Sequence, residues 1–181
     1  FSDWSSDVCS SDLLKEATIL ADNLSIYGTI TIENGEYESI KVYGSATSHN
    51  YLSVDFLDVT GNFNFCECSG KNIKICGDFH GDSITHSECF DAFVGSDCKC
   101  AKIDANQVHI IVTKRKSIFK RPTVYCDEVS GETITAENLV SKKVRGKVIN
   151  LKGFSKIDEL IYTESYTAED SCEIKKIIHD V

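Results

Sequence analysis

Hydrophobic and polar residues alternate in short stretches along the first half of the chain, and each stretch ends in a glycine. Residues 24–28 read LSIYG, and the same order of apolar, any, apolar, any, glycine returns at residues 40–44, 57–61 and 73–77. The closing glycines therefore stand at positions 28, 44, 61 and 77. This spacing is too regular for chance and too short for independent hairpins or βαβ units. The pattern predicts a repeat protein.

The glycines are expected at corners between short strands. Apolar residues at alternate positions place one face of a strand inward, and a second alternation follows several glycines, as with Ile30 and Ile32 or Phe63 and Phe65. A corner between the two needs a positive φ or a close backbone approach, which a Cβ would prevent. The predicted corners are Gly28, Gly44, Gly61, Gly77 and Gly95.

The length of the repeat predicts an all-β, three-sided β-solenoid with coils of about 16–17 residues. Three sides of five or six residues account for each repeat, and each coil would pair with the next at about 4.8 Å. After Pro122 the pattern becomes an apolar residue at every fifth position, which no helix or flat strand explains. The inward residues predicted from it are Val124, Val129, Ile134, Leu139, Val144, Ile149 and Phe154.

We divide the chain by these patterns. Residues 14–112 form the N-terminal part of the solenoid, 113–122 a basic loop, and 123–160 the C-terminal part of the same solenoid. Residues 161–181 are expected to be a closing coil or tail, in which Ile174, Ile177 and Ile178 form either a short capping helix or a last strand.

The first thirteen residues, FSDWSSDVCSSDL, differ in composition from the rest. They are rich in Ser and Asp, are aperiodic and contain the single Trp of the chain. They resemble a translated sequencing-adapter read, so residues 1–13 are expected to be non-native, with a native disordered tail as the alternative. An N-terminal targeting or anchoring segment ahead of residue 14 therefore stays open.

Composition narrows the class of protein. The 181 residues are 41% hydrophobic and 26% charged, as in an ordinary globular domain. The net charge of −9 becomes −6 without Asp3, Asp7 and Asp12, and this acidity argues against broad nucleic-acid binding. The cysteines are expected to be reduced packing residues of a cytoplasmic protein.

Three stretches together resemble the bactofilins, in particular the longer Gram-positive polymer-forming cytoskeletal proteins. They are residues 23–28 (NLSIYG), 35–44 (GEYESIKVYG) and 124–146 (VYCDEVSGETITAENLVSKKVRG). The resemblance spans about residues 22–160. It implies a right-handed three-sided β-helix that polymerises end to end without nucleotide.

The physics of a solenoid gives a separate reason to expect assembly. The first and last coils leave backbone N–H and C=O groups unpaired, which makes each end a template for another subunit. Contacts between like ends would give a filament without polarity. The sequence thus predicts a non-enzymatic, self-assembling scaffold that binds copies of itself and protein clients.

Two cysteine patterns are candidates for zinc sites. In the first, Cys66 and Cys68 could bind one ion together with Cys98 and Cys100. However, the two cysteines of each pair are separated by one residue, which is unusual for a structural zinc site. The two pairs are also expected to lie two coils apart, at a distance of about 10 Å. A second set has the spacing C-x3-H-x5-H-x2-C, which matches no familiar zinc finger. Its members are Cys76, His80, His86 and Cys89. We therefore predict no metal site and no cofactor.

A basic segment stands out in the acidic chain. It could dock on an anionic membrane surface, with cations at the headgroups and two apolar side chains inserted, or it could be a solvated loop. Its residues are Lys114, Arg115, Lys116, Ile118, Phe119, Lys120 and Arg121. The first alternative would place the protein at the inner face of the membrane.

Enzymatic motifs are missing from the sequence. It contains no G-x4-G-K-[ST], G-x-G-x-x-G, H-E-x-x-H or G-x-S-x-G, so no catalytic residue is predicted. An alternative function is suggested by the five-residue period and by residues 136–139 (AENL), which resemble pentapeptide-repeat proteins. This resemblance implies an acidic four-sided β-helix that binds proteins or mimics DNA. Four sides of five would need about twenty residues per coil, which argues against it.

Overall fold

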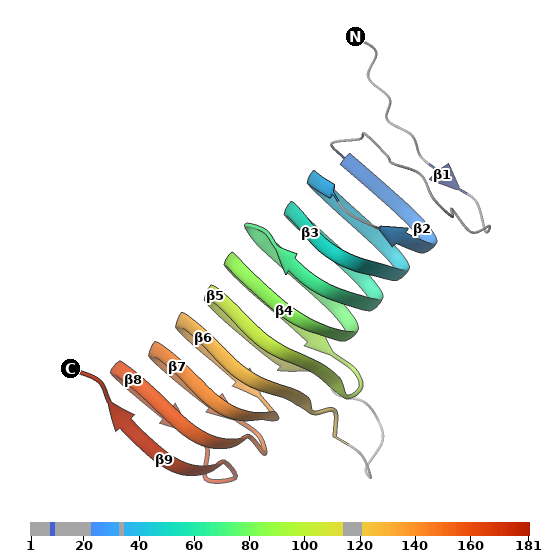
Figure 1. Ribbon diagram of the computed structural model, residues 1–181. Coiled ribbons are helices and arrows are strands. Elements are labelled where there is room, and N and C mark those ends of the chain that lie inside the picture. The colour runs from blue at the N-terminus through green and yellow to red at the C-terminus, as the bar shows by residue number, and fades with distance from the viewer. Residues whose placement is uncertain (1–7, 10–22, 33–34, 114–120) are drawn as a thin grey trace.

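The chain forms one continuous parallel sheet that winds in stacked coils (Figure 1). The computed structural model describes residues 8–9, 23–32, 35–113 and 121–181. The strands are β1 (Val8–Cys9), β2 (Asn23–Ile32), β3 (Gly35–Ser69), β4 (Asn72–Val94), β5 (Cys98–Val112), β6 (Val124–Glu137), β7 (Leu139–Lys152), β8 (Lys156–Ala168) and β9 (Glu173–His179). Their order in the sheet is their order in the sequence, so β1 and β9 lie at opposite ends of the stack.

The register between coils reproduces the repeat of the sequence. We call the difference in number between two paired positions the advance of the coil. Leu24 pairs with Ile40 and Leu57 with Ile73, so the advance is 16 in both places. Between β6 and β7 the advance is 15, since Val124 pairs with Leu139, and between β8 and β9 it is 17. These advances confirm the predicted all-β solenoid.

Two coils in the middle of the stack are longer. His80 pairs with Lys99, an advance of 19, and after a register shift Phe90 pairs with Val108, an advance of 18. From β5 to β6 the advance is 26, since Cys98 pairs with Val124. Residues 95–97 lie outside the strands between β4 and β5, and so do residues 113 and 121–123 between β5 and β6. The coils on either side stay in parallel register.

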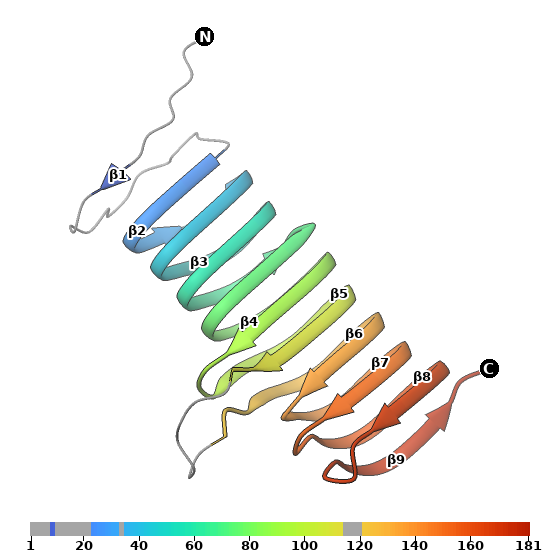
Figure 2. The same ribbon diagram turned by 180° about the vertical axis from the view of Figure 1, so that it is seen from behind.

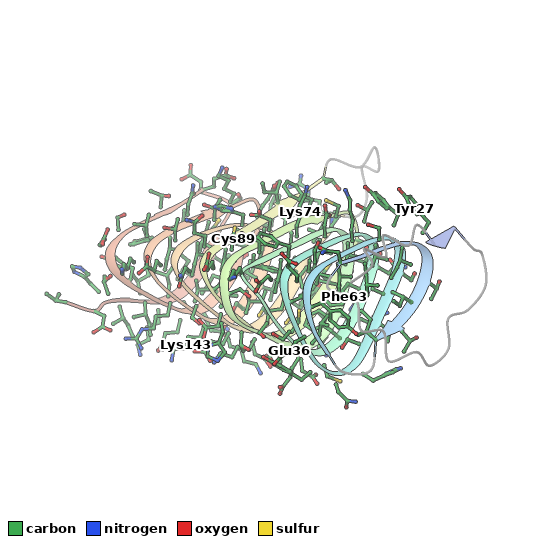
Figure 3. The ribbon with its side chains drawn as sticks, turned by 90° about the horizontal axis from the view of Figure 1, so that it is seen from above. Tyr27, Glu36, Phe63, Lys74, Cys89 and Lys143 are labelled. Carbon is green, nitrogen blue, oxygen red and sulfur yellow. The ribbon has the colours of Figure 1, made fainter. Side chains whose placement is uncertain are left out.

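Side chains that point inward fill the interior of the coils. Figure 3 shows Phe63 enclosed by the ribbon, whereas Tyr27, Glu36 and Lys143 point outward. Phe63, Phe79 and Phe90 are fully buried, and the last two meet edge to face at 5.7 Å. Burial of such a side chain contributes roughly 1.5–3 kcal/mol, so a continuous apolar interior holds neighbouring coils together.

The five-residue period is confirmed at six positions and wrong at the seventh. Val124, Val129, Ile134, Leu139, Val144 and Ile149 are fully buried, but Phe154 is 49% exposed. Gly153 turns the chain with φ 64°, and the fully buried Ser155 takes the inward place. The Ser155 hydroxyl accepts a hydrogen bond from Leu139 N at 3.1 Å and donates one to Lys152 O at 2.8 Å.

The closing segment ends in a strand. β9 pairs in parallel with β8 from Lys156↔Glu173 to Tyr162↔His179 and is the last strand of the stack (Figure 2). Of the two alternatives for Ile174 and Ile177, the last strand is the one observed. The residues that the structure describes form no helix, so they include no helix long and apolar enough to span a membrane.

Two residues of the N-terminal thirteen belong to the sheet. Val8 and Cys9 pair with Ile26 and Tyr27 of β2. The other positions of the ten-residue strand β2 have no partner in β1.

Candidate functional site

Four of the predicted corner glycines adopt backbone angles that disfavour other residues. Their φ values are 126° at Gly28, 141° at Gly44, 134° at Gly61 and 147° at Gly77. Each lies against the one before it, because a Cβ on Gly61 would overlap the carbonyl oxygen of Gly44, and the same holds for Gly44 against Gly28 and Gly77 against Gly61. The corners are therefore a column of backbone contacts that leaves no room for side chains.

Gly95 differs from the other four. It lies in the bend that follows β4, and its φ is not positive. Residues 95–97 belong to no strand, and β5 begins after them at Cys98. These three residues take the place of the tight glycine corner of the earlier coils.

Aromatic side chains cover the outer face of the first coils. Tyr27 and Tyr43 occupy the position before successive corner glycines, and their rings stack with centroids 4.9 Å apart. The Lys41 ammonium lies 5.3 Å from the centre of the Tyr43 ring. Tyr27 is 59% exposed, so its ring lies at the surface of the first coil.

The basic segment is described only at its end. Lys114, Arg115, Lys116, Ile118, Phe119 and Lys120 lie outside the described residues. The Arg121 guanidinium lies 4.2 Å from the centre of the Phe154 ring. This cation–π contact fixes the point where the chain re-enters the solenoid.

The cysteines of the first candidate zinc set are mostly packing residues. Cys68, Cys98 and Cys100 are buried, and the Cys100 thiol donates a hydrogen bond to Lys102 O at 3.1 Å. Burial raises the pKa of Cys68 and of Cys98 to about 12. Buried and protonated, these thiols fit the packing role expected for them from the sequence.

The second candidate set is divided by the structure. Among the described residues, metal-ligating atoms gather in one group of three, and it contains Cys89 together with Asp91 and His109 but not Cys76, His80 or His86. The Asp91 and His109 side chains were not singled out from the sequence. Their separation along the chain, 18, equals the advance of this coil, and that spacing is the signal that could have linked them.

The C-terminal end presents an open strand edge. β9 pairs with β8 on one side, and no described strand pairs with its other side. Ile177 is 45% exposed there. Its charged neighbours face back toward β8: Lys175 pairs with Asp158 at 2.7 Å, and Lys176 pairs with Glu159 at 2.9 Å.

Comparison of the chain with family models, curated proteins and solved structures finds no match in any of the three. The arguments for function therefore rest on the geometry of the coils, the outer faces and the ends.

Proposed function

We propose that this protein is a non-enzymatic, bactofilin-like scaffold that assembles by stacking its terminal coils. The observation that carries the proposal is the open edge of β9, a seven-residue strand with an exposed isoleucine and no described element covering it. An unprotected edge of this kind templates strand addition. Addition of a second solenoid extends the same parallel stacking that already joins the coils within one chain.

The charges at this edge support the proposal. Lysine on an edge strand normally opposes strand addition, but Lys175 and Lys176 are both paired with carboxylates of the preceding coil. Glu173 is likewise paired with Lys156, at 3.0 Å. The edge therefore carries less free charge than its sequence suggests.

The outer faces suit a scaffold that binds clients. Many of their charged side chains form ion pairs between successive coils, as Lys71 does with Asp55 and Lys147 with Glu132. Exposed pairs of this type contribute at most about 1 kcal/mol each. In the proposed function the protein is cytoplasmic, its clients bind these faces, and the basic segment is the part that would meet a membrane surface.

The pentapeptide-repeat alternative is less well supported. Four five-residue sides require an advance of about twenty, whereas the advance from β6 to β7 is 15 and from β2 to β3 is 16.

The test compares two isoleucines that are exposed to a similar degree. Ile177 on β9 and Ile111 on β5 are 45% and 41% exposed. The full chain and its Ile177→Lys and Ile111→Lys variants are examined by negative-stain electron microscopy and by sedimentation across a concentration series. We expect filaments from the wild type and from Ile111→Lys, and short particles from Ile177→Lys. A monomeric wild type at high concentration would overturn the proposal, as would unchanged assembly of Ile177→Lys.

A further inference from the structure

We propose that Cys89, Asp91 and His109 form a binding site for a zinc ion on the outer face of the solenoid. Their ligating atoms, one thiol sulfur, one carboxylate oxygen and one imidazole nitrogen, all lie within 4.8 Å of one another. Three such ligands from protein side chains, with a fourth position left to water, are the usual set of an open zinc site. The metal would join two consecutive coils.

The backbone brings these side chains together. Cys89 and Asp91 are two residues apart on β4, so they point to the same side of the strand. Asp91 pairs directly with His109 of β5. The alternating residues Phe90, Ala92 and Val108 point inward and are buried, which holds the three ligands on rigid strands.

Cys89 is fixed by an irregularity in the register. The pairing of β4 with β5 shifts between Ile84 and Ser87. Just after the shift, the N–H groups of Glu88 and Cys89 both donate to Lys71 O, at 3.0 and 2.9 Å. These two bonds anchor the cysteine backbone to the preceding coil, so its side chain has a defined direction.

The distances suit tetrahedral coordination after a small movement. The His109 Nδ1 and Asp91 Oδ1 atoms are 2.8 Å apart, and their side chains are 38% and 34% exposed. Zinc bonds of about 2.0–2.3 Å at tetrahedral angles place ligand atoms about 3.3–3.7 Å apart. A rotation that separates Asp91 from His109 by roughly half an ångström therefore admits the ion, and the partial exposure leaves a path for entry and room for a bound water.

The protonation changes on binding can be followed atom by atom. The Cys89 S–H bond is replaced by a sulfur–zinc bond, and one proton passes to solvent. His109 coordinates through the lone pair of Nδ1 in its neutral form, with its proton on Nε2. Asp91 binds as a carboxylate, so the site with Zn²⁺ carries no net charge.

The site also explains why these residues lie together on an outer face. Several outer positions of this solenoid hold ion pairs between coils. Without Cys89, the contact between Asp91 and His109 would be one more such pair. The thiol is a soft ligand that an ion pair does not need. Soft thiolate ligands select zinc over magnesium or calcium.

Cobalt titration of the reduced, metal-stripped full chain tests the proposal. We expect visible bands of tetrahedral Co²⁺ with a thiolate charge-transfer band, saturating at one ion per chain and displaced by Zn²⁺. The Cys89→Ser, Asp91→Asn and His109→Gln variants should each bind at least about tenfold more weakly.

Matched controls come from the same strand, β4. Cys76→Ser and His80→Gln remove a thiol and an imidazole outside the group of three, and both should bind Co²⁺ as the wild type does. In a second measurement, Zn²⁺ at about 100 times its dissociation constant should raise the Tm of the wild type by about 5–10 °C. Circular dichroism checks that each variant is folded. If Cys89→Ser fails to fold, the loss of metal binding is judged from His109→Gln instead.

The proposal is overturned if the wild type gives no tetrahedral cobalt spectrum. It is equally overturned if the spectrum and the Zn²⁺-dependent rise in Tm persist in His109→Gln, since other cysteines would then be the ligands. Assembly does not enter either readout, so the outcome is independent of the proposed scaffold function.

Discussion

Replacement of Asn138 by alanine should destabilise the solenoid more than any single exposed substitution. Asn138 is buried and has φ 53°, a left-handed conformation that asparagine tolerates and alanine does not. Its Nδ2 donates to Pro122 O at 3.0 Å, and its Oδ1 accepts from Phe154 N at 2.9 Å. One side chain thus links three successive coils at a corner.

The magnitude follows from these contacts. Each hydrogen bond contributes about 0.5–1.5 kcal/mol, with a further loss where the partner stays buried and unpaired. The left-handed conformation adds roughly 1–2 kcal/mol for alanine. The free energy of unfolding should therefore fall by about 2–5 kcal/mol, which for a chain of this length lowers the Tm by about 5–20 °C.

The assay is thermal unfolding followed by circular dichroism, at a concentration where sedimentation shows one species. The control is Asn64→Ala, because Asn64 is exposed on the outer face of β3, where such changes stay within about 0.5 kcal/mol. Asn138→Gly removes the same hydrogen bonds without the strain and should be no worse than Asn138→Ala. A Tm of Asn138→Ala equal to that of Asn64→Ala would show that the Asn138 side chain contributes nothing to stability at this corner.

Three further predictions follow from the corners, the thiols and the basic segment. Gly61→Ala meets both a positive φ and the Gly44 carbonyl, so it should abolish soluble folded protein in an expression and circular dichroism test, whereas Gly95→Ala should fold. Since burial raises the pKa of Cys68 and Cys98 to about 12, the folded state keeps both thiols protonated. Their contribution to stability is complete below pH 9 and is lost between pH 9 and 12, so the Tm should fall over that range, and less steeply in Cys68→Ala. Charge reversal of the lysines and arginines in residues 114–121 should abolish co-sedimentation with anionic liposomes; binding that survives reversal would exclude this segment as the docking site.

The repeat could be predicted from sequence because the same physical constraint recurs in each coil. Stacked corners exclude a Cβ at Gly44 and Gly61, so glycine marks the period directly. An inward position must be apolar in every coil. The coil advance from β6 to β7 is 15 residues, so three equal sides would have five residues each. The period of five in the second half therefore reflects the geometry itself.

The failures occur where the coil length changes. The period placed Phe154 inward, but the left-handed turn at Gly153 gives that place to Ser155. An advance of 16 or 17 would have placed Gln107 or Val108 beside Asp91, and only the observed advance of 18 brings His109 there. A regular repeat cannot reveal a side-chain cluster that depends on an irregular coil.

The distribution of charge between the two ends indicates which ends meet. β2 contains no charged residue, whereas β9 carries Lys175 and Lys176 near its centre. In an antiparallel contact between two β9 strands, centred on Lys176, the lysines of the two copies would face each other. Like charges in that position destabilise by roughly 0.2–1 kcal/mol per pair, and the ion pairs of Lys175 and Lys176 with Asp158 and Glu159 offset part of this repulsion. A contact between β9 and the N-terminal end, where β1 pairs only with Ile26 and Tyr27 of β2, avoids this repulsion. If the chain assembles through its ends as proposed, we therefore expect a filament with polarity in place of the like-end contacts expected from sequence.

Salt separates the two arrangements. Raising NaCl from about 0.1 to 1 M shortens the screening length from about 10 to 3 Å, which would promote a contact between two β9 strands and leave a contact between β2 and β9 nearly unchanged. The Lys176→Gln variant should mimic high salt only in the first case, with Lys142→Gln as a control because Lys142 pairs with Asp127 in the body of the solenoid. We expect the critical concentration, measured by sedimentation, to change less than about twofold across this salt range. A steep fall that Lys176→Gln reproduces at low salt would show that like ends meet, because both changes remove the repulsion between the lysines, whereas loss of the Lys176–Glu159 pair alone would not lower the critical concentration.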